Sequence, residues 1–378
     1  MPDVVMYADT FRSPELRHEV PIGIPDPFLY VEKDGVRHIM ISSMEIPRLA
    51  ELGLFELHPR EEFGYDDLIA EGRGLDDVTR ELRLRTLREL GVTSALVPES
   101  FPVGAADHLR ANGIELVPDL EHFEERRRVK TQFEIEGIRR AQAAAEAGMS
   151  AARDLLRRAQ ANGDVLTVDG EPLTSERLKV AISQEFVAHG ATADEFIVSH
   201  GAQTAIGHNM GSGRIRAGET VVIDLWPRDN ESFCFADMTR TFVVGAVPDE
   251  TAEWHRLCKE ALERAVAEIR PGLDGKIVFD RTCDLFEAAG YPTQRTKTPG
   301  EPLDDGFFHG LGHGVGLEVH EAPRLAIVSD KELKAGDVVT VEPGLYRQGV
   351  GGVRLEDLVL VTDDGAENLT SFPYELTP

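Results

Sequence analysis

The sequence predicts two domains, an N-terminal α/β domain over residues 1–125 and a C-terminal α+β domain over residues 126–378. Strand and helix signals alternate in the first part, whereas the second part shows two helices followed by a hairpin of apolar strands, and this order occurs twice. The charged segment Glu124–Lys130 marks the boundary between the two parts. The repeated order indicates an internal pseudo-duplication of the C-terminal domain.

The elements of the N-terminal domain follow from apolar patterns and turn residues. The segment 28–42 predicts a hairpin, because Asp34-Gly35 lies between two strand-like runs. The other expected elements are helices and short strands: 46–52, 65–71, 78–90, 94–98, 104–112 and 114–118. Five scattered histidines are expected to be structural or exposed: His18, His38, His58, His108 and His122. We therefore expect this domain to cover a site or to form a dimer.

A long helix opens the C-terminal domain. Thr131 and Glu134 form a capping box, apolar residues then recur at spacings of three and four, and Asn162-Gly163 is expected to end the helix. A short polar hairpin (165–174) and a helix ending near residue 189 are expected next, followed by a strand from residue 196. The remaining expected elements are an apolar hairpin (220–226 with 235–244), two helices (249–269 and 276–289) and a second apolar hairpin (338–346 with 352–361).

Charge and cysteine content restrict the possible partners and the compartment. A formal net charge of −27 argues against binding to nucleic acid or to an anionic membrane, because both require a basic surface. Three widely spaced cysteines, Cys234, Cys258 and Cys283, form no disulfide framework and favour a reducing compartment. The N-terminal residues lack the basic segment of a signal peptide, and no apolar run approaches the length of a membrane span. A cytoplasmic protein is expected.

The segment 308–321 contains three histidines and closely spaced glycines. His309 and His313 have the spacing of a zinc-binding helix, but glycine at every second position makes a helix unfavourable. The glycines are instead expected to let the backbone approach a bound group. His320 lies in a run, 317–320, that predicts a strand. Three ordinary buried histidines are the alternative interpretation.

Each strand of the two C-terminal hairpins carries one acidic residue at a position that should be apolar. Burial of several unpaired carboxylates is costly, and Arg240 and Arg354 are the only basic residues nearby in the sequence. Two divalent cations would balance the four charges, and one imidazole could complete the site. Mn²⁺, Co²⁺ and Zn²⁺ all suit such ligands. The four acids, Asp224, Asp237, Glu342 and Glu356, therefore predict metal-assisted hydrolysis.

The order of these motifs resembles the creatinase/prolidase family of "pita-bread" metallopeptidases, which includes methionine aminopeptidase, aminopeptidase P and prolidase. The matching motifs are Asp224, Asp-Met-Thr-Arg-Thr from Asp237, His-Gly-x-Gly-His with Val-His-Glu, Glu-Pro-Gly from Glu342 and Arg-x-Glu-Asp from Arg354. The resemblance covers the whole second domain and extends to the size and α/β character of the first. It implies a curved antiparallel sheet, two metal ions, with manganese or cobalt favoured over zinc, and a homodimer.

The resemblance also implies a role for each site residue. Asp224 would chelate one metal, and Asp237 and Glu356 would bridge the pair. His313 and Glu342 would complete the other metal, with Glu342 also serving as proton shuttle. The remaining residues would orient the substrate, stabilise the tetrahedral intermediate or anchor the acids: His208, His309, His320 and Arg354.

The two-domain layout and the Val-His-Glu motif point to the Xaa-Pro branch, so the expected substrate is a small peptide with proline after the N-terminal residue. Arg324 lies where some prolidases place an arginine that could pair with the free carboxylate of a dipeptide. This favours a dipeptidase over aminopeptidase P, although Arg324 could be a plain surface residue. Trp226-Pro227 and Cys234 depart from the family pattern, which leaves substrate preference open.

Two other functions are compatible with the same fold. One is a hydrolase of a non-peptide amide or amidine, similar to ectoine hydrolase, and the other is a catalytically silent binding protein. Creatinase itself works without metal and lacks the full ligand set, and silent relatives have usually lost ligands. The five ligand positions are intact here, which favours the metallopeptidase.

Overall fold

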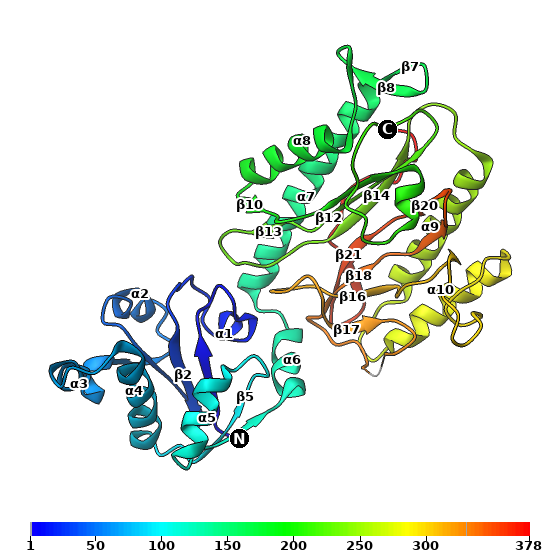
Figure 1. Ribbon diagram of the computed structural model, residues 1–378. Helices are drawn as coiled ribbons and strands as arrows, with labels where there is room; N and C mark the ends of the chain where they lie inside the picture. The colour runs from blue at the N-terminus through cyan, green and yellow to red at the C-terminus, as the bar shows by residue number, and fades with distance from the viewer. Residues whose placement is uncertain (1, 330) are drawn as a thin grey trace. The chain divides into compact units, whose positions relative to one another are not determined.

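The computed structural model describes residues 2–329 and 331–378. The chain forms two compact units, Met1–Arg127 and Arg128–Pro378, coloured blue to cyan and cyan to red in Figure 1. In the described part of the chain, no helix is long and apolar enough to cross a membrane.

A mixed six-stranded sheet, of order β4-β3-β2-β1-β5-β6, forms the centre of the N-terminal unit. Its strands are β1 (Val4–Ala8), β2 (Phe28–Lys33), β3 (Val36–Ile41), β4 (Glu56–Pro59), β5 (Ser94–Val97) and β6 (Glu115–Pro118). Its helices are α1 (Pro14–Glu19), α2 (Ile46–Ala50), the 3₁₀ helix η1 (Arg60–Phe63), α3 (Tyr65–Ala70), α4 (Leu75–Glu89), α5 (Val103–Ala111) and α6 (Leu120–Arg128). Apolar side chains of α3, α4 and α5 pack on one face of the sheet, and those of α1, α2 and α6 pack on the other. The expected α/β layers and the β2–β3 hairpin are both present.

Five elements of this unit have no counterpart in the sequence prediction: β1, α1, β4, η1 and α6. The charged segment expected to act as a boundary lies largely within α6. Arg126 in that helix forms ion pairs with Glu19 at 2.6 Å and with Glu32 at 2.8 Å. These charges therefore have fixed partners inside the unit, which a charge count along the sequence cannot reveal.

Two helix pairs pack on two antiparallel sheets in the C-terminal unit. Apolar residues of α7 (Gln132–Arg158) and α8 (Ser175–Ala188) pack on the sheet β11-β12-β14. Those of α9 (Asp249–Glu268) and α10 (Gly275–Ala288) pack on the sheet that contains β16, β18 and β21. The order of two helices and a hairpin thus occurs twice, as the sequence predicts (Figure 1).

The remaining bounds in this unit complete the description. The strands are β7 (Gln160–Asn162), β8 (Val165–Val168), β9 (Glu171–Pro172), β10 (Ala191–Thr192), β11 (Ile197–His200), β12 (Thr220–Leu225), β13 (Arg228–Asp229), β14 (Met238–Val243), β15 (Asp305–Gly306), β16 (Gly312–Gly314), β17 (Glu321–Leu325), β18 (Val338–Val341), β19 (Gly344–Arg347), β20 (Gly351–Arg354), β21 (Asp357–Val361) and β22 (Ala366–Asn368). The 3₁₀ helix η2 covers Gly201–Ala205.

The predicted capping box at Thr131 and Glu134 begins α7. The helix ends at Arg158 rather than at Asn162-Gly163, because residues 160–162 pair with β8 as strand β7. Gly163, with a φ of +67°, and Asp164 form the two-residue turn of that hairpin, so the glycine serves a hairpin turn and not a helix end.

The two predicted hairpins differ in regularity. β12 pairs with β14 in continuous antiparallel register from Thr220↔Val243 to Leu225↔Met238. The second hairpin is broken in the middle: β18 pairs with β21, β19 pairs with β20, and Glu342-Pro343 and Leu355-Glu356 lie between these pairs. Proline cannot donate a ladder hydrogen bond, which explains the break on one side.

The strand predicted over 317–320 is wrong, because these residues form bends and β17 begins at Glu321. The backbone N–H of Glu318 donates to the Glu321 side chain at 3.1 Å, which holds the segment in a turn. The glycine pattern also serves a different purpose from the one expected. A Cβ on Gly312 would lie 2.0 Å from the Thr340 carbonyl oxygen, and one on Gly314 would lie 2.3 Å from that of Ala322. These glycines let strands of the protein itself approach closely around His313.

Candidate metal centre

The four acids converge from four strand ends. Asp224 lies in β12, Asp237 immediately precedes β14, Glu342 immediately follows β18, and Glu356 lies between β20 and β21. A cavity of about 490 Å³ is lined by nine of the ten residues that the sequence predicts for the site: Asp224, Asp237, Glu342, Glu356, His208, His309, His313, His320 and Arg354. The break in the second hairpin therefore places Glu342 and Glu356 at the cavity, whereas a regular ladder would have kept both residues within strands.

Three of these residues form a compact cluster. One ligand atom from each of Asp237, His313 and Glu356 lies within 4.8 Å of the others. Nε2 of His313 is 3.8 Å from Oδ2 of Asp237 and 3.7 Å from Oε1 of Glu342. The hydroxyl of Thr239 donates to Oε2 of Glu356 at 2.7 Å and orients that carboxylate.

The ring of His313 has the tautomer that metal ligation needs. Its Nδ1 donates to the carbonyl oxygen of Gly314 at 3.1 Å, so the lone pair on Nε2 faces the acids. Burial, followed by the nearby His320, lowers the pKa of His313 to about 3, so the ring is neutral. A neutral imidazole oriented by a backbone carbonyl is the usual form of a metal-binding histidine.

The protein's own charges leave the acids under-compensated. Burial, followed by the neighbouring carboxylates, raises the pKa of Asp237 and of Glu356 well above the usual range. Burial also raises the pKa of Glu342 to about 8. Arg354 pairs with Oδ2 of Asp224, so the four ionised acids and this arginine would carry a net charge of −3. Two divalent cations supply +4 and nearly balance this charge.

Two carboxylate oxygens in the cluster have no protein partner. Oδ1 of Asp224 and Oδ1 of Asp237 are buried and accept no hydrogen bond from any residue that the structure describes. A buried carboxylate oxygen without a partner is costly unless a cation binds it. The donor set of carboxylates and one neutral imidazole therefore fits a pair of divalent metal ions.

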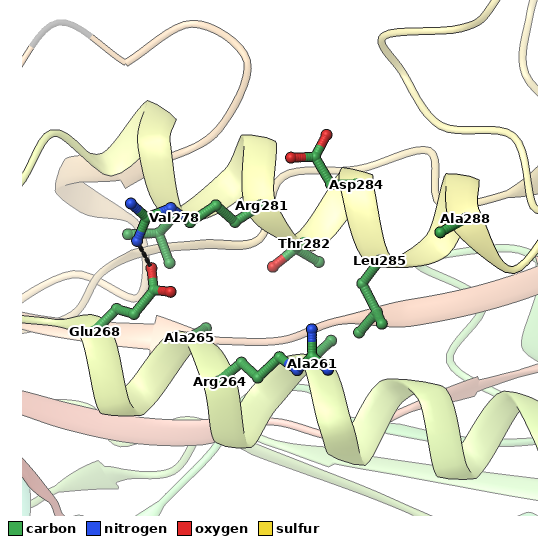
Figure 2. A pocket seen from close by; sticks show the side chains of 10 residues that line it. All are labelled: Ala261, Arg264, Ala265, Glu268, Val278, Arg281, Thr282, Asp284, Leu285 and Ala288. Carbon is green, nitrogen blue, oxygen red and sulfur yellow. Dashed lines mark hydrogen bonds and ion pairs between the residues drawn. The ribbon is translucent and has the colours of Figure 1, made fainter.

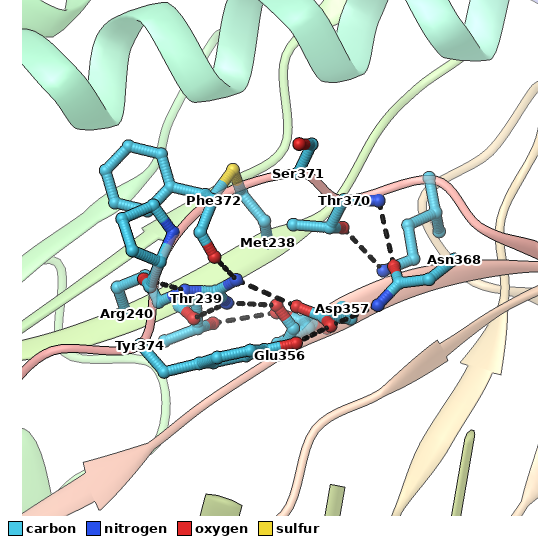
Figure 3. Close-up of polar contacts among 12 residues, drawn as sticks. Met238, Thr239, Arg240, Glu356, Asp357, Asn368, Thr370, Ser371, Phe372 and Tyr374 are labelled. Carbon is cyan, nitrogen blue, oxygen red and sulfur yellow. Dashed lines mark hydrogen bonds and ion pairs between the residues drawn. The ribbon is translucent and has the colours of Figure 1, made fainter. Parts of the chain in front are cut away.

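Arg240, the other basic residue close in sequence, points away from the cavity. Figure 3 shows its guanidinium bound to Asp357, with Nη2 2.9 Å from Oδ1. Its Nη1 donates to the backbone carbonyl of Glu356 at 2.7 Å. Arg240 therefore holds the backbone of Glu356 without neutralising its carboxylate.

Tyr346 is a site residue that the sequence analysis missed. Its hydroxyl donates to Nε2 of His309 at 2.8 Å, and Nδ1 of His309 donates to the Gly310 carbonyl at 2.7 Å. Nη1 of Arg354 donates to the tyrosine oxygen at 3.1 Å. Its spacing of four residues from Glu342 was a weak signal, because tyrosine is common in ordinary strands.

Tyr346→Phe is expected to lower kcat about fivefold, since one neutral hydrogen bond is worth about 1 kcal/mol and 1.4 kcal/mol corresponds to tenfold. The orientation of His309 would be lost, while metal content and melting temperature should change little. Steady-state kinetics with metal analysis checks this. Tyr65→Phe, which alters a half-buried tyrosine of the N-terminal unit, is the matched control. An unchanged kcat in Tyr346→Phe would remove the tyrosine from the site.

The other predicted residues lie around the cluster. The ring of His320 is edge-on to that of His313, with centroids 4.3 Å apart, and His208 is exposed on the cavity lining. Arg324 stands opposite His313 in the β16–β17 register, but its side chain is exposed and is not part of the lining. Several apolar residues of the cavity wall were not predicted from the sequence: Ile197, Met210, Phe308 and Val319.

A second cavity, of about 340 Å³, lies between α9 and α10 (Figure 2). Arg281 and Glu268 form an ion pair at this cavity, and Ala261, Ala265 and Leu285 are among its apolar lining. It shares no lining residue with the acid-lined cavity. The predicted site residues therefore gather around one cavity only, within the described part of the chain.

Sequence comparison gives relatives over much of this unit. Residues 136–363 match the model of metallopeptidase family M24. An Xaa-Pro dipeptidase of Pyrococcus furiosus is 34% identical over 249 residues, which cover 66% of this chain and 64% of that protein, just under two thirds of its length. An Xaa-Pro dipeptidase of Pyrococcus horikoshii is 30% identical over 289 residues, covering 76% of this chain and 75% of that protein.

Structure comparison extends the likeness to the whole chain. The Xaa-Pro dipeptidase from Bacillus anthracis superposes with a TM-score of 0.79 and 25% identity, covering 100% of this chain and 94% of that one. The pita-bread fold expected from the sequence is thereby confirmed, and the M24 match implies divalent metal ions in the site. The buried acids, the neutral His313 and these relatives agree: the chain belongs to metallopeptidase family M24.

Proposed function

We propose that this protein is an Xaa-Pro dipeptidase that uses two divalent metal ions to hydrolyse the bond before proline. The observation that carries the proposal is the cluster of Asp237, His313 and Glu356, in which buried ligand atoms lie within 4.8 Å of one another at the wall of a cavity. The likeness to proteins named Xaa-Pro dipeptidase supports the choice of substrate.

We assign the ligands as the sequence implies, with Asp224 on one ion, His313 and Glu342 on the other, and Asp237 and Glu356 between them. When bound, the ions would polarise the scissile carbonyl group and activate a water molecule. Manganese or cobalt is favoured, and zinc is the alternative.

Glu342 is the proposed proton carrier. Its side chain is 18% exposed, whereas that of Asp237 is 6% exposed, so Glu342 is the more accessible to a substrate in the cavity. Its carboxylate would accept a proton from the attacking water and then, as the carboxylic acid, deliver it to the proline nitrogen. Nδ1 of His309 lies 3.8 Å from its Oε2, which places the Tyr346–His309 pair beside the same group.

The cavity walls suit a proline side chain. An Xaa-Pro bond has no amide N–H to recognise, and the ring is rigid and apolar. Apolar side chains of Ile197, Trp226, Phe308 and Val319 line the cavity and could hold such a ring. Trp226 is one of the residues that depart from the family pattern, so it is a natural position for setting the preferred peptide.

Purified protein, stripped of metal and reloaded with Mn²⁺ or Co²⁺, tests the proposal directly. We expect hydrolysis of Ala-Pro, slower hydrolysis of Ala-Pro-Ala and none of Ala-Ala. Faster cleavage of the tripeptide would indicate an aminopeptidase P. Absence of Xaa-Pro cleavage with metal bound would leave an amide or amidine hydrolase, and absence of bound metal would leave a silent binding protein. A homodimer and a cytoplasmic location also stay predictions, the first testable by light scattering.

Arg324→Ala is expected to raise KM for Ala-Pro roughly 10- to 100-fold, the effect of losing a charge-assisted hydrogen bond. The KM for Ala-Pro-Ala should change less, because its carboxylate lies one residue further away. Arg324→Lys is the control, since it keeps the charge but not the two-pronged geometry. Equal losses on both peptides would remove Arg324 from substrate binding.

A further inference from the structure

Two histidines that look unrelated in the sequence meet in the N-terminal unit. Nδ1 of His38, in β3, is 3.2 Å from Nε2 of His58, in β4. Oε2 of Glu56 is 3.5 Å from the same Nδ1. One ligand atom from each of the three side chains lies within 4.8 Å of the others. The two histidines therefore lie together in the fold, although they are twenty residues apart in the sequence.

The register of two strands brings this group together. β3 and β4 are parallel, with His38 opposite Glu56 and Met40 opposite His58. Because side chains two residues apart share a face of a strand, His38, Glu56 and His58 all lie on one face of the sheet. β4 is the edge strand of that sheet. The arrangement is therefore built by backbone pairing, not by mobile surface side chains meeting by chance.

The distances match those of ligands around one small cation. Two nitrogen ligands at 2.0–2.1 Å from a tetrahedral Zn²⁺ are separated by roughly 3.3–3.4 Å, close to the 3.2 Å between the two rings. A hydrogen bond between the rings would give a similar separation. A hydrogen bond between the two rings does not require a third group. A metal site does, and the carboxylate of Glu56 beside the same nitrogen supplies it as a third ligand.

Further contacts hold His58 in the form needed for ligation. Its Nδ1 donates to Oε2 of Glu62 at 2.9 Å, so the lone pair on Nε2 points at His38. Phe63 packs against the ring, with centroids 5.8 Å apart. A carboxylate behind a histidine is the usual support of a zinc ligand. Burial, the largest cause, lowers the pKa of His38, although Glu56 acts in the opposite direction.

We propose that His38, through Nδ1, His58, through Nε2, and the carboxylate of Glu56 bind one Zn²⁺ ion, with water as the fourth ligand. The proton of His38 then resides on Nε2, so binding shifts a tautomer and releases no proton from this ring. Side-chain exposures of 13% for His38 and 20% for His58 leave the site open to an entering ion. The bound ion would link the edge strand β4 to β3.

Zinc analysis of the full-length protein tests this site. After equilibration with buffered micromolar Zn²⁺, the double variant His38→Asn/His58→Asn is expected to hold one ion fewer per chain than the wild type. His189→Asn is the matched control, because His189 stands beside Glu185 at 3.7 Å but belongs to no metal-binding cluster of the described residues. That variant should hold as much zinc as the wild type. Equal zinc in the wild type and the folded double variant would overturn the proposal.

A second pair of variants keeps both rings and therefore the packing. Glu56→Gln is expected to weaken zinc binding at this site at least tenfold, measured by competition with a chelator. Glu62→Gln is expected to weaken it about 10- to 100-fold, the range for groups that orient a ligand. If the double histidine variant does not fold, Glu56→Gln decides the question: an unchanged affinity would refute the site. Peptidase kinetics should be unaltered in all these variants, which separates this ion from those of the acid-lined cavity.

Discussion

An Asp237→Ala protein is expected to lose nearly all peptidase activity and most of its bound metal. Asp237 is 4% exposed, one of its oxygens has no protein partner, and the other lies 3.8 Å from the nitrogen lone pair of His313. Removing it takes away a ligand that we propose both ions share. Metal ions contribute several kcal/mol to such reactions, so the loss in kcat/KM should be about 10³-fold or more. Peptide kinetics and metal analysis on the same preparation measure this.

Glu356→Ala should have the same effect, because Glu356 is the other proposed bridging ligand. Asp363→Asn is the matched control, since it removes an exposed acid of the same unit. The N-terminal unit should stay folded in all three variants. Turnover retained in either site variant would contradict the assignment of that acid as a bridging ligand.

Arg240→Met is expected to destabilise the C-terminal unit by about 3–5 kcal/mol, the effect of leaving a buried charge without its partner. The side chains of Arg240 and Asp357 are 1% and 0% exposed. The guanidinium also donates to the backbone carbonyls of Thr239, Glu356, Phe372 and Pro373. Both tryptophans, Trp226 and Trp254, lie in this unit, so their fluorescence during urea unfolding reports on it alone.

A double-mutant cycle separates the charge pair from the packing. Arg240→Met/Asp357→Asn should be less destabilised than the sum of the single variants, since neither charge is then left alone. Arg139→Met is the control, because its ion pair with Glu367 is about half exposed and worth less than about 1 kcal/mol. Additive effects of Arg240 and Asp357 would show that the ion pair is not the source of the stability.

The four acids of the site could be predicted from the sequence, because a charged residue within an apolar strand conflicts with the burial of that strand. Asp224 and Glu356 stand in apolar runs, and that conflict can be recognised without coordinates. The order of helices and hairpins followed from periodicity in the same way. The glycines on both sides of His313 also excluded a helix from the sequence alone, whereas His313 as a ligand was implied only by the family resemblance.

Contacts between distant segments could not be recognised. Arg240 and Arg354 are equivalent in the sequence, yet one binds Asp357 and the other binds Asp224, because they come from strands that present different faces. His38 and His58 are twenty residues apart, and only the pairing of β3 with β4 joins them. The purpose of Gly312 and Gly314 was misread for the same reason, since the close neighbours are strands of the protein itself.

Because of the break in the second hairpin, the number of residues near Leu355 determines which carboxylate faces the cavity. Glu356 and Asp357 are adjacent, and their carboxylates serve opposite sides of one strand, the first bound by Thr239 and the second by Arg240. Deleting or inserting one residue near Leu355 would exchange the two sides and send the wrong carboxylate to each partner. Length variation, in natural variants or in engineering, should therefore be confined to the exposed turn at residues 348–350.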